Sequence, residues 1–167
     1  YARGEITHDN KIEKTSVRNG TKVVFKPDGE IFKNFHFLPE YVEDQIWNYV
    51  YLNSGLTINF NGEKYYSENG LKDLLERKTD VEKIRYPIIH LKCSDIEAAL
   101  THGDQYGEEY YSFVNGQHTT QGGTHLAAFR EAVVRTIREF YKKDFDPSDI
   151  RASIIGTISL RKLKQYF

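Results

Sequence analysis

The segment Asn115–His125 has the clearest potential for chemistry, because it joins an expected strand to an expected long helix and contains Gly116, Gly122 and Gly123. Glycines that open a helix can hold an anion, such as a phosphate group, on free backbone N–H groups. The alternative is a tight strand-to-helix connection in which the glycines only satisfy backbone geometry. No lysine-bearing phosphate loop is present, so the sequence favours the geometric interpretation.

The histidines, acids and single thiol of the chain do not form a recognisable catalytic or metal site. His118 and His125 are close in sequence to His102, but no cysteine or carboxylate cluster shares a ligand-like spacing with them. Glu108-Glu109 is expected at a solvated strand edge, and no acid and base pair stands out. Cys93 is expected to be a small core residue. We therefore predict no metal site and no catalytic residue in this segment.

Arg130 is the residue that breaks a local rule. On a helical wheel it falls between Val134 and Ile137, inside the apolar stripe of the expected long helix. A basic strip lies on the neighbouring flank and consists of Arg135, Arg138 and Lys142. Two interpretations remain open. Arg130 buries the aliphatic part of its side chain and keeps its guanidinium group in water, or it faces a cavity that needs a positive charge.

These residues need a scaffold of alternating helices and strands. Extended segments are predicted over residues 5–26, and a helix from Pro39 to about Asn53. Asn61-Gly62 predicts a hairpin, and further strands follow near residues 88–91, 96–102 and 108–114. Thr124 is a capable N-cap for a helix to about Lys143, and the last strand covers residues 154–160. The predicted fold class is α/β (α+β), as a sandwich.

Composition limits the classes of function. The chain has 167 residues, with 39% hydrophobic and 28% charged residues, which is typical of a soluble globular domain. Its net charge is −1, so any contact with nucleic acid must come from a local patch. The absence of an apolar leader or spanning segment favours a cytoplasmic protein. Because the chain contains no methionine, we expect it to be a fragment.

Several motifs together resemble one family. Ser112–Gly116, then Thr119–His125 and Phe129-Arg130, are similar to the transducer-domain signature of the ATPase subunits of bacterial type IIA DNA topoisomerases, which are gyrase B and the B subunit of topoisomerase IV. Gly20–Asp28 resembles the last strand of the preceding ATP-binding domain, and Asp149–Ser159 also matches in order and spacing. The glutamine-rich loop at Asn115–Gln121 is more like topoisomerase IV. The resemblance covers nearly the whole chain.

The resemblance implies two parts and a tail. Residues 1–34 would be the C-terminal strands of a GHKL ATP-binding domain, and residues 35–162 a transducer domain with the fold of ribosomal protein S5 domain 2. Residues 163–167 are an unassigned tail. By the same resemblance Thr21 and Val23 would line the adenine pocket, and Arg130 would line the cavity through which transported DNA passes.

The implied activity is ATP-dependent passage of one DNA duplex through another. ATP and Mg²⁺ would be cofactors of the full-length protein. Its partners would be double-stranded DNA, a second copy of the same subunit and the DNA-cleaving subunit of the topoisomerase. The family's catalytic glutamate, magnesium-binding asparagine and glycine-rich lid are absent from this chain. After Arg161 a Gln-Thr-Lys loop is expected but not found, so Lys162 is not assigned as the catalytic lysine.

Two other classes of function remain open at this stage. The chain could be a stand-alone nucleic-acid-binding module with the S5-like fold, or a transducer-like domain of another GHKL ATPase. The glycine-rich segment that ends in Thr124-His125 argues against both.

Overall fold

The computed structural model describes residues 4–8, 14, 16 and 24–161, and the chain divides into two units, Tyr1–Phe37 and Leu38–Phe167. The described residues of the first unit contain no helix and no strand longer than an isolated bridge at Glu5. Val24 and Phe25, expected at the end of a strand, are 81% and 68% exposed and lie in no strand. The Phe25 ring contacts that of Phe37 edge to face, with centroids 5.8 Å apart, but the Val24 and Phe25 side chains stay largely in solvent, so the burial that would favour a strand is missing.

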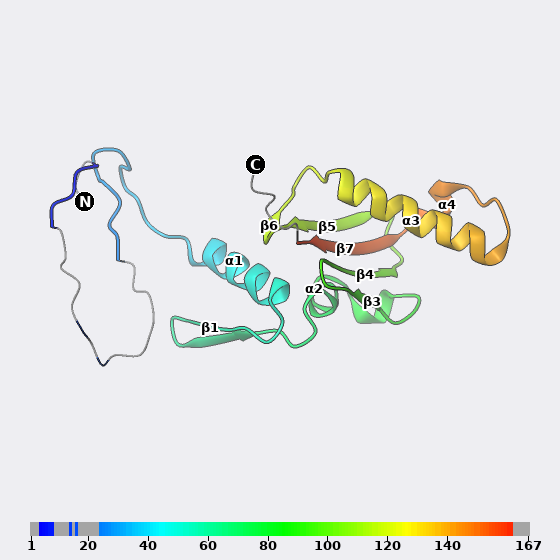
Figure 1. Ribbon diagram of the computed structural model, residues 1–167, viewed down its shortest axis with the longest axis horizontal. Helices are drawn as coiled ribbons and strands as arrows, with labels where there is room; N and C mark the ends of the chain where they lie inside the picture. The colour runs from blue at the N-terminus through cyan, green and yellow to red at the C-terminus, as the bar shows by residue number, and fades with distance from the viewer. Residues whose placement is uncertain (1–3, 9–13, 15, 17–23, 162–167) are drawn as a thin grey trace. The chain divides into compact units, whose positions relative to one another are not determined.

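The second unit is built on a five-stranded sheet with the order β3-β4-β7-β5-β6 (Figure 1). Its strands are β3 (Ile89–Lys92), β4 (Ile96–His102), β5 (Glu109–Val114), β6 (Gln117–His118) and β7 (Ile154–Leu160). β7 pairs antiparallel with β4 and parallel with β5, while β3 and β6 pair antiparallel with their neighbours. The last strand in sequence therefore occupies the centre of the sheet.

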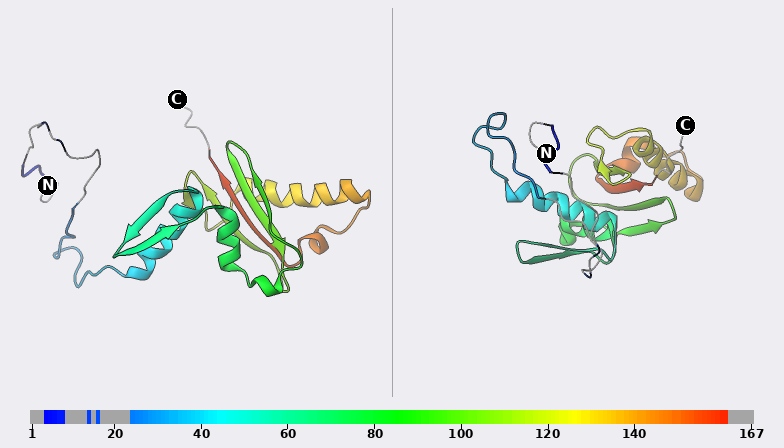
Figure 2. Two further views of the ribbon diagram at one scale, coloured as in Figure 1. Left: turned by 90° about the horizontal axis from the view of Figure 1, so that it is seen from below. Right: turned by 60° about the vertical axis from the view of Figure 1, so that its left-hand side comes forward.

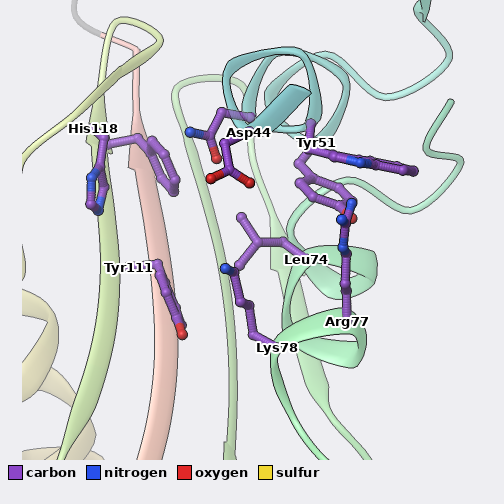
Figure 3. A pocket seen from close by; sticks show the side chains of 10 residues that line it. Asp44, Tyr51, Leu74, Arg77, Lys78, Tyr111 and His118 are labelled. Carbon is purple, nitrogen blue, oxygen red and sulfur yellow. The ribbon is translucent and has the colours of Figure 1, made fainter. Parts of the chain in front are cut away.

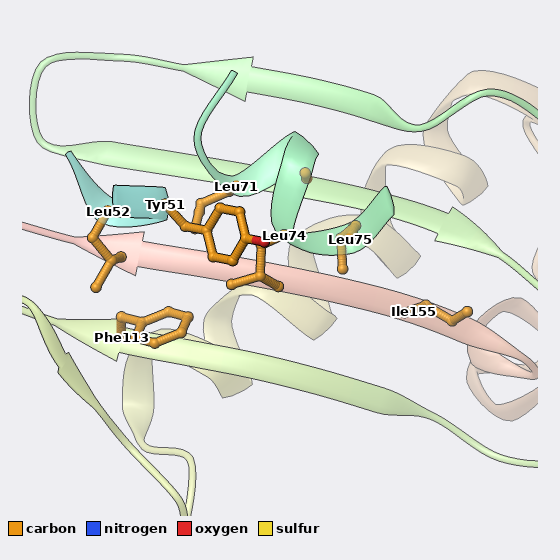
Figure 4. Close-up of a cluster of buried hydrophobic side chains, with 8 residues drawn as sticks. Tyr51, Leu52, Leu71, Leu74, Leu75, Phe113 and Ile155 are labelled. Carbon is orange, nitrogen blue, oxygen red and sulfur yellow. The ribbon is translucent and has the colours of Figure 1, made fainter. Parts of the chain in front are cut away.

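Two helices cover one face of this sheet. α1 (Pro39–Leu52) begins with a proline that suits the first helical turn, and α2 (Leu71–Lys78) follows a hairpin of β1 (Thr57–Phe60) and β2 (Glu63–Tyr66). Figure 4 shows the cluster in which Leu74 of α2 and Tyr51 of α1 pack against the sheet residues Phe113 and Ile155. A second cluster of Ile46, Val50 and Tyr65 holds the hairpin against α1.

The long helix α3 (Thr124–Tyr141) packs on the opposite face of the sheet (Figure 2). Phe129 of α3 contacts a cluster that includes Ile154 and Ile158 of β7, and Val133 and Leu126 extend the contact. The short helix α4 (Pro147–Arg151) then leads into β7, and a 3₁₀ turn, η1 (Val81–Lys83), precedes β3. None of the described helices is long and apolar enough to cross a membrane.

This arrangement confirms the predicted α/β fold class. The Asn61-Gly62 hairpin is confirmed, with φ values of 51° and 88° that suit a tight hairpin turn. The long helix starts at the predicted residue, but its N-cap is Gly123 rather than Thr124, and no side chain caps it. The domain boundary was predicted near residue 34, and the structure divides the chain into two units after Phe37. The predicted tail at residues 163–167 lies outside the described residues.

Gly156 marks the tightest packing at the centre of the sheet. A Cβ atom at this position would lie 3.0 Å from Cδ1 of Tyr110 and 3.1 Å from Cε1 of Phe129. These two rings also contact each other edge to face, with centroids 6.3 Å apart. A side chain at this position would push against both rings, and the rings also restrict each other, so the site favours glycine.

We predict that Gly156→Ala lowers the free energy of unfolding of the unit by about 1–3 kcal/mol, because the added methyl group overpacks the contact between the two rings. Chemical unfolding followed by the fluorescence of Trp47, the single tryptophan, measures this change. Gly29→Ala is the control, since nothing lies within 4 Å of a Cβ added there. Equal stability of the two variants would contradict the assignment.

Candidate nucleic-acid interface

Arg130 of α3 is held by the carboxylate of Glu108, which lies just before β5. Its Nε donates to Glu108 Oε2 at 2.9 Å and its Nη2 donates to Glu108 Oε1 at 2.8 Å. The Arg130 side chain is 40% exposed and the Glu108 side chain 23% exposed. This two-bond geometry fixes the plane of the guanidinium group, so Arg130 is presented to solvent in one orientation.

The same carboxylate also binds two other side chains. Nε of Arg151, in α4, donates to Glu108 Oε1 at 3.1 Å, and the hydroxyl of Tyr110 donates to Oε2 at 2.8 Å. The guanidinium of Arg130 lies 5.6 Å from the centroid of the Tyr110 ring. Glu108, Tyr110, Arg130 and Arg151 thus form one network, called here the Glu108 cluster, which connects α3, α4 and the start of β5.

Opposing effects set the charge state of the Glu108 cluster. Burial by itself raises the pKa of the Glu108 carboxyl, but the hydrogen bonds from Arg130, Tyr110 and Arg151 outweigh burial, and the net pKa is lowered. The bonds to Glu108 raise the pKa of Arg130, while burial and the adjacent carboxylate raise the pKa of Tyr110. At neutral pH Glu108 is therefore a carboxylate and Arg130 a cation, and Tyr110 is a neutral donor.

The structure gives Arg130 a partner that the sequence did not identify. Glu108 lies exposed just before a strand, as expected, but three neighbours bind its carboxylate, which the sequence did not indicate. Arg130 also lines a groove of about 380 Å³ together with Arg138 and Arg151. Its expected role as a residue facing transported DNA stays a prediction.

The basic strip expected beside Arg130 is divided between separate tasks. Arg138 donates to the carbonyl of Phe145 through Nε and Nη2, at 2.8 and 2.6 Å, and pairs with Asp144 at 3.0 Å. These contacts fasten the loop that follows α3. Arg135 instead points into solvent, with a 71% exposed side chain and a long contact to Glu139. Only part of the strip is free for a ligand.

The glycine-rich segment serves as a tight connection between β6 and α3. Gly122 has a φ of 73°, a backbone conformation that residues with a Cβ atom rarely adopt. Thr119 closes the segment onto β5, since its N–H donates to the carbonyl of Ser112 at 2.8 Å and its hydroxyl lies 2.5 Å from that of Ser112. His125 in turn lies within 3.3 Å of the Thr119 hydroxyl. These bonds support the geometric interpretation.

The histidines contact structural partners. His102 lies 2.5 Å from the Tyr86 hydroxyl and 2.8 Å from the carbonyl of Ile150, and His118 packs against the Phe113 ring. Among the described residues, no group of three or more His, Cys, Asp or Glu side chains could hold a metal ion. The expectation that Cys93 is buried is wrong: it is exposed in the turn between β3 and β4.

Two residues assigned by resemblance to an adenine pocket, Thr21 and Val23, lie outside the described residues, as does Lys162. The residues that the structure describes therefore contain no assigned contact to ATP or Mg²⁺. No catalytic step can be derived from them.

A pocket of about 160 Å³ with both polar and apolar walls was missed by sequence reasoning (Figure 3). It lies between α1, α2 and the β5–β6 hairpin, and Asp44, Arg77, Lys78, Tyr111 and His118 are among its lining residues. The guanidinium of Arg77 lies over the Trp47 ring, 4.1 Å from its centroid. One of the cations that line the pocket is therefore already engaged by an aromatic ring. Residues so scattered in sequence leave no motif by which the pocket could have been found.

A cavity of about 450 Å³ with almost entirely apolar walls lies beside α3, over β3 and β4. Ile89, Leu91 and Ile96 are 45%, 56% and 46% exposed along it. Val133 and Ile137 form its helical wall. This face of the sheet is thus only partly covered by α3 within the described chain.

Comparison with known proteins places these features in a family. A model of the family described as DNA gyrase B matches residues 37–167. The chain is 37% identical over 161 residues to the B subunit of DNA topoisomerase 4 from Borreliella burgdorferi, and 30% identical over 189 aligned residues to the B subunit of DNA gyrase from Clostridium acetobutylicum. These alignments cover 96% and 100% of this chain, but it spans only 27% and 30% of the two relatives.

Solved structures show the same fold. The 43K ATPase domain of Thermus thermophilus gyrase B superimposes with a TM-score of 0.67 at 24% identity, covering 86% of this chain and 44% of that one. The B-subunit of the DNA gyrase from Myxococcus xanthus gives a TM-score of 0.72 at 14% identity, over 90% of this chain and 50% of that one.

We predict that Glu108→Gln destabilises the protein by about 1–2 kcal/mol between about pH 6 and pH 8, because the part-exposed cluster loses its shared charge. The folded-state pKa of Glu108 is lowered, so its contribution is present above the ordinary carboxyl pKa of about 4.3 and is lost as the pH falls through the folded value. Melting temperatures of both proteins from about pH 3 to about pH 8 measure the difference, which should be constant near neutrality and shrink as the pH falls below about 4.

Glu139→Gln is the matched control for this measurement, since Glu139 is 71% exposed and its pair with Arg135 is long. It should change the melting temperature little at any pH. A pH-independent difference between the wild type and Glu108→Gln would show that the charge of Glu108 does not hold the cluster.

Proposed function

The chain belongs to the DNA gyrase B family, and we propose that it is part of the ATPase subunit of a type IIA DNA topoisomerase, similar to the B subunit of topoisomerase IV. In the full-length protein this subunit couples ATP binding and hydrolysis to the passage of one DNA duplex through another. The observation that carries the proposal is the family match over residues 37–167, which includes the whole five-stranded sheet and the Glu108 cluster.

Within this proposal residues 35–162 are the transducer, which passes the nucleotide state on to movement of the DNA gate. Its packing in three layers supports such a role, because helices on both faces tie the sheet into one body. Thr21 and Val23 line the adenine pocket of the preceding ATP-binding domain, whose remaining ATP and Mg²⁺ contacts come from elsewhere in the full-length protein. No catalytic residue is assigned to this chain.

The proposed partners are double-stranded DNA, a second copy of the same subunit and the DNA-cleaving subunit of the topoisomerase, and the proposed location is the cytoplasm. A stand-alone nucleic-acid-binding module and a different GHKL ATPase remain the alternatives. The family match favours the topoisomerase over both. The deciding experiment is an ATP-dependent decatenation or relaxation assay with the full-length protein and the DNA-cleaving subunit: a complete lack of strand passage would refute the proposal.

The isolated chain is predicted not to bind ATP with useful affinity. One wall of a pocket, formed by Thr21 and Val23, cannot replace the phosphate and magnesium ligands that this chain lacks. Isothermal titration calorimetry with and without Mg²⁺ tests this prediction. Magnesium-dependent binding at about micromolar ATP, a free energy near −8 kcal/mol, would show that the chain carries a nucleotide site of its own.

We predict that Arg130→Gln in the full-length enzyme lowers the ratio of DNA-stimulated to DNA-free ATP turnover and slows strand passage. Its partly exposed guanidinium would contact phosphates and add affinity that depends on salt but not on base sequence. Turnover with and without DNA, together with the melting temperature of the same variant, measures both possible roles. A large fall in melting temperature with normal DNA stimulation would make Arg130 a scaffold residue only.

A further inference from the structure

We propose that Arg151 is a second phosphate-contacting side chain beside Arg130, and that Glu108 is the positioning residue that holds the two guanidinium groups together for the backbone of a DNA duplex. This inference rests on the proposed function and deepens it. The three side chains come from α4, α3 and the start of β5. Their juxtaposition is not visible in any single stretch of the sequence.

The groove in front of these side chains has the right charge for a phosphate. It is lined by the three arginines Arg130, Arg138 and Arg151, and Glu131 is the acid among its lining residues. The apolar residues Ala127, Val134 and Pro147 form the rest of its wall. Positive charge in a shallow groove of this kind attracts a polyanion and tolerates any base sequence.

Glu108 leaves both arginines with unused donors. Arg130 binds Glu108 through Nε and Nη2, which leaves its Nη1 without a hydrogen bond to Glu108. Arg151 binds Glu108 through Nε, which leaves its Nη1 and Nη2 without a hydrogen bond to Glu108. Both guanidinium groups donate to the same oxygen, Oε1. One carboxylate therefore neutralises only part of the charge of two cations and keeps them adjacent, which lowers the ordering cost of binding.

Arg138 does not share this role although it lines the same groove. Its Nε and Nη2 are bound to the carbonyl of Phe145, and Nη2 also pairs with Asp144. These contacts fix the chain between α3 and α4, and no bond connects Arg138 to Glu108 among the described contacts. The inference is thus specific to Arg130 and Arg151.

The test uses the full-length protein assembled with the DNA-cleaving subunit, and a short fluorescently labelled DNA duplex as the probe. Binding is measured by fluorescence anisotropy over a salt series. Arg151→Gln and Arg130→Gln should each reduce the slope of log K against log salt by about one. Arg135→Gln removes the same charge from an exposed site on α3 and should leave the slope unchanged.

Glu108→Gln separates positioning from simple electrostatics. Removing an acid from a DNA-binding groove should strengthen binding if only net charge matters. If Glu108 positions the two arginines, binding should instead weaken by about threefold or more, because the guanidinium groups lose their shared partner. Stronger binding by Glu108→Gln would overturn the positioning role.

Other outcomes are equally informative. Arg151→Gln with an unchanged salt slope and a lowered melting temperature would make Arg151 a tether of α4 and overturn its DNA contact. Should Arg151→Gln fail to fold, Arg151→Lys keeps the charge, and a wild-type slope in that variant is expected while a lost slope would contradict the proposal. If the wild-type enzyme lacks strand passage, the proposed function itself fails. If only Arg151 behaves unexpectedly, the failure is limited to this inference.

Discussion

Burial of the strand β7 on both faces is the constraint on which the unit from Leu38 to Phe167 depends. Ile155 faces the helices α1 and α2, while Ile154 and Ile158 face α3. The pairings with β4 on one side and β5 on the other bring strands of distant sequence into one sheet. Because each face of β7 contributes to a different cluster, a disturbance of this strand reaches both helical layers.

The Glu108 cluster is coupled to this core through neighbouring residues. Tyr110 packs its ring against Phe129 above Gly156 and donates its hydroxyl to Glu108, so one side chain belongs to both the core and the cluster. Phe129 and Arg130 are adjacent in α3 and point into these two environments. A shift of α3 along the sheet would therefore disturb both the ring contact in the core and the bonds between Arg130 and Glu108.

Local patterns in the sequence were sufficient for much of the fold. The Asn61-Gly62 turn, the proline at the start of α1 and the apolar spacing of α3 each depend on residues close in sequence, and each predicted element is present. Long-range pairing was not readable in this way. Glu108 meets Arg130 and Arg151 across 22 and 43 residues, and no local rule indicates that an acid before a strand will bind two helices. The exposure of Cys93 was missed for a similar reason, since burial depends on which sheet face a helix covers.

The position of β7 in the sequence also affects how the chain can fold during synthesis. Every other strand of the sheet emerges from the ribosome earlier, and β5 can form its parallel pairing only after the residues of α3 and α4 have been made. Until then one edge of β4 and one edge of β5 lack their partner, and such edges favour association with other chains. The nascent chain should therefore depend on early formation of α3, or on a chaperone, to protect these edges until β7 arrives.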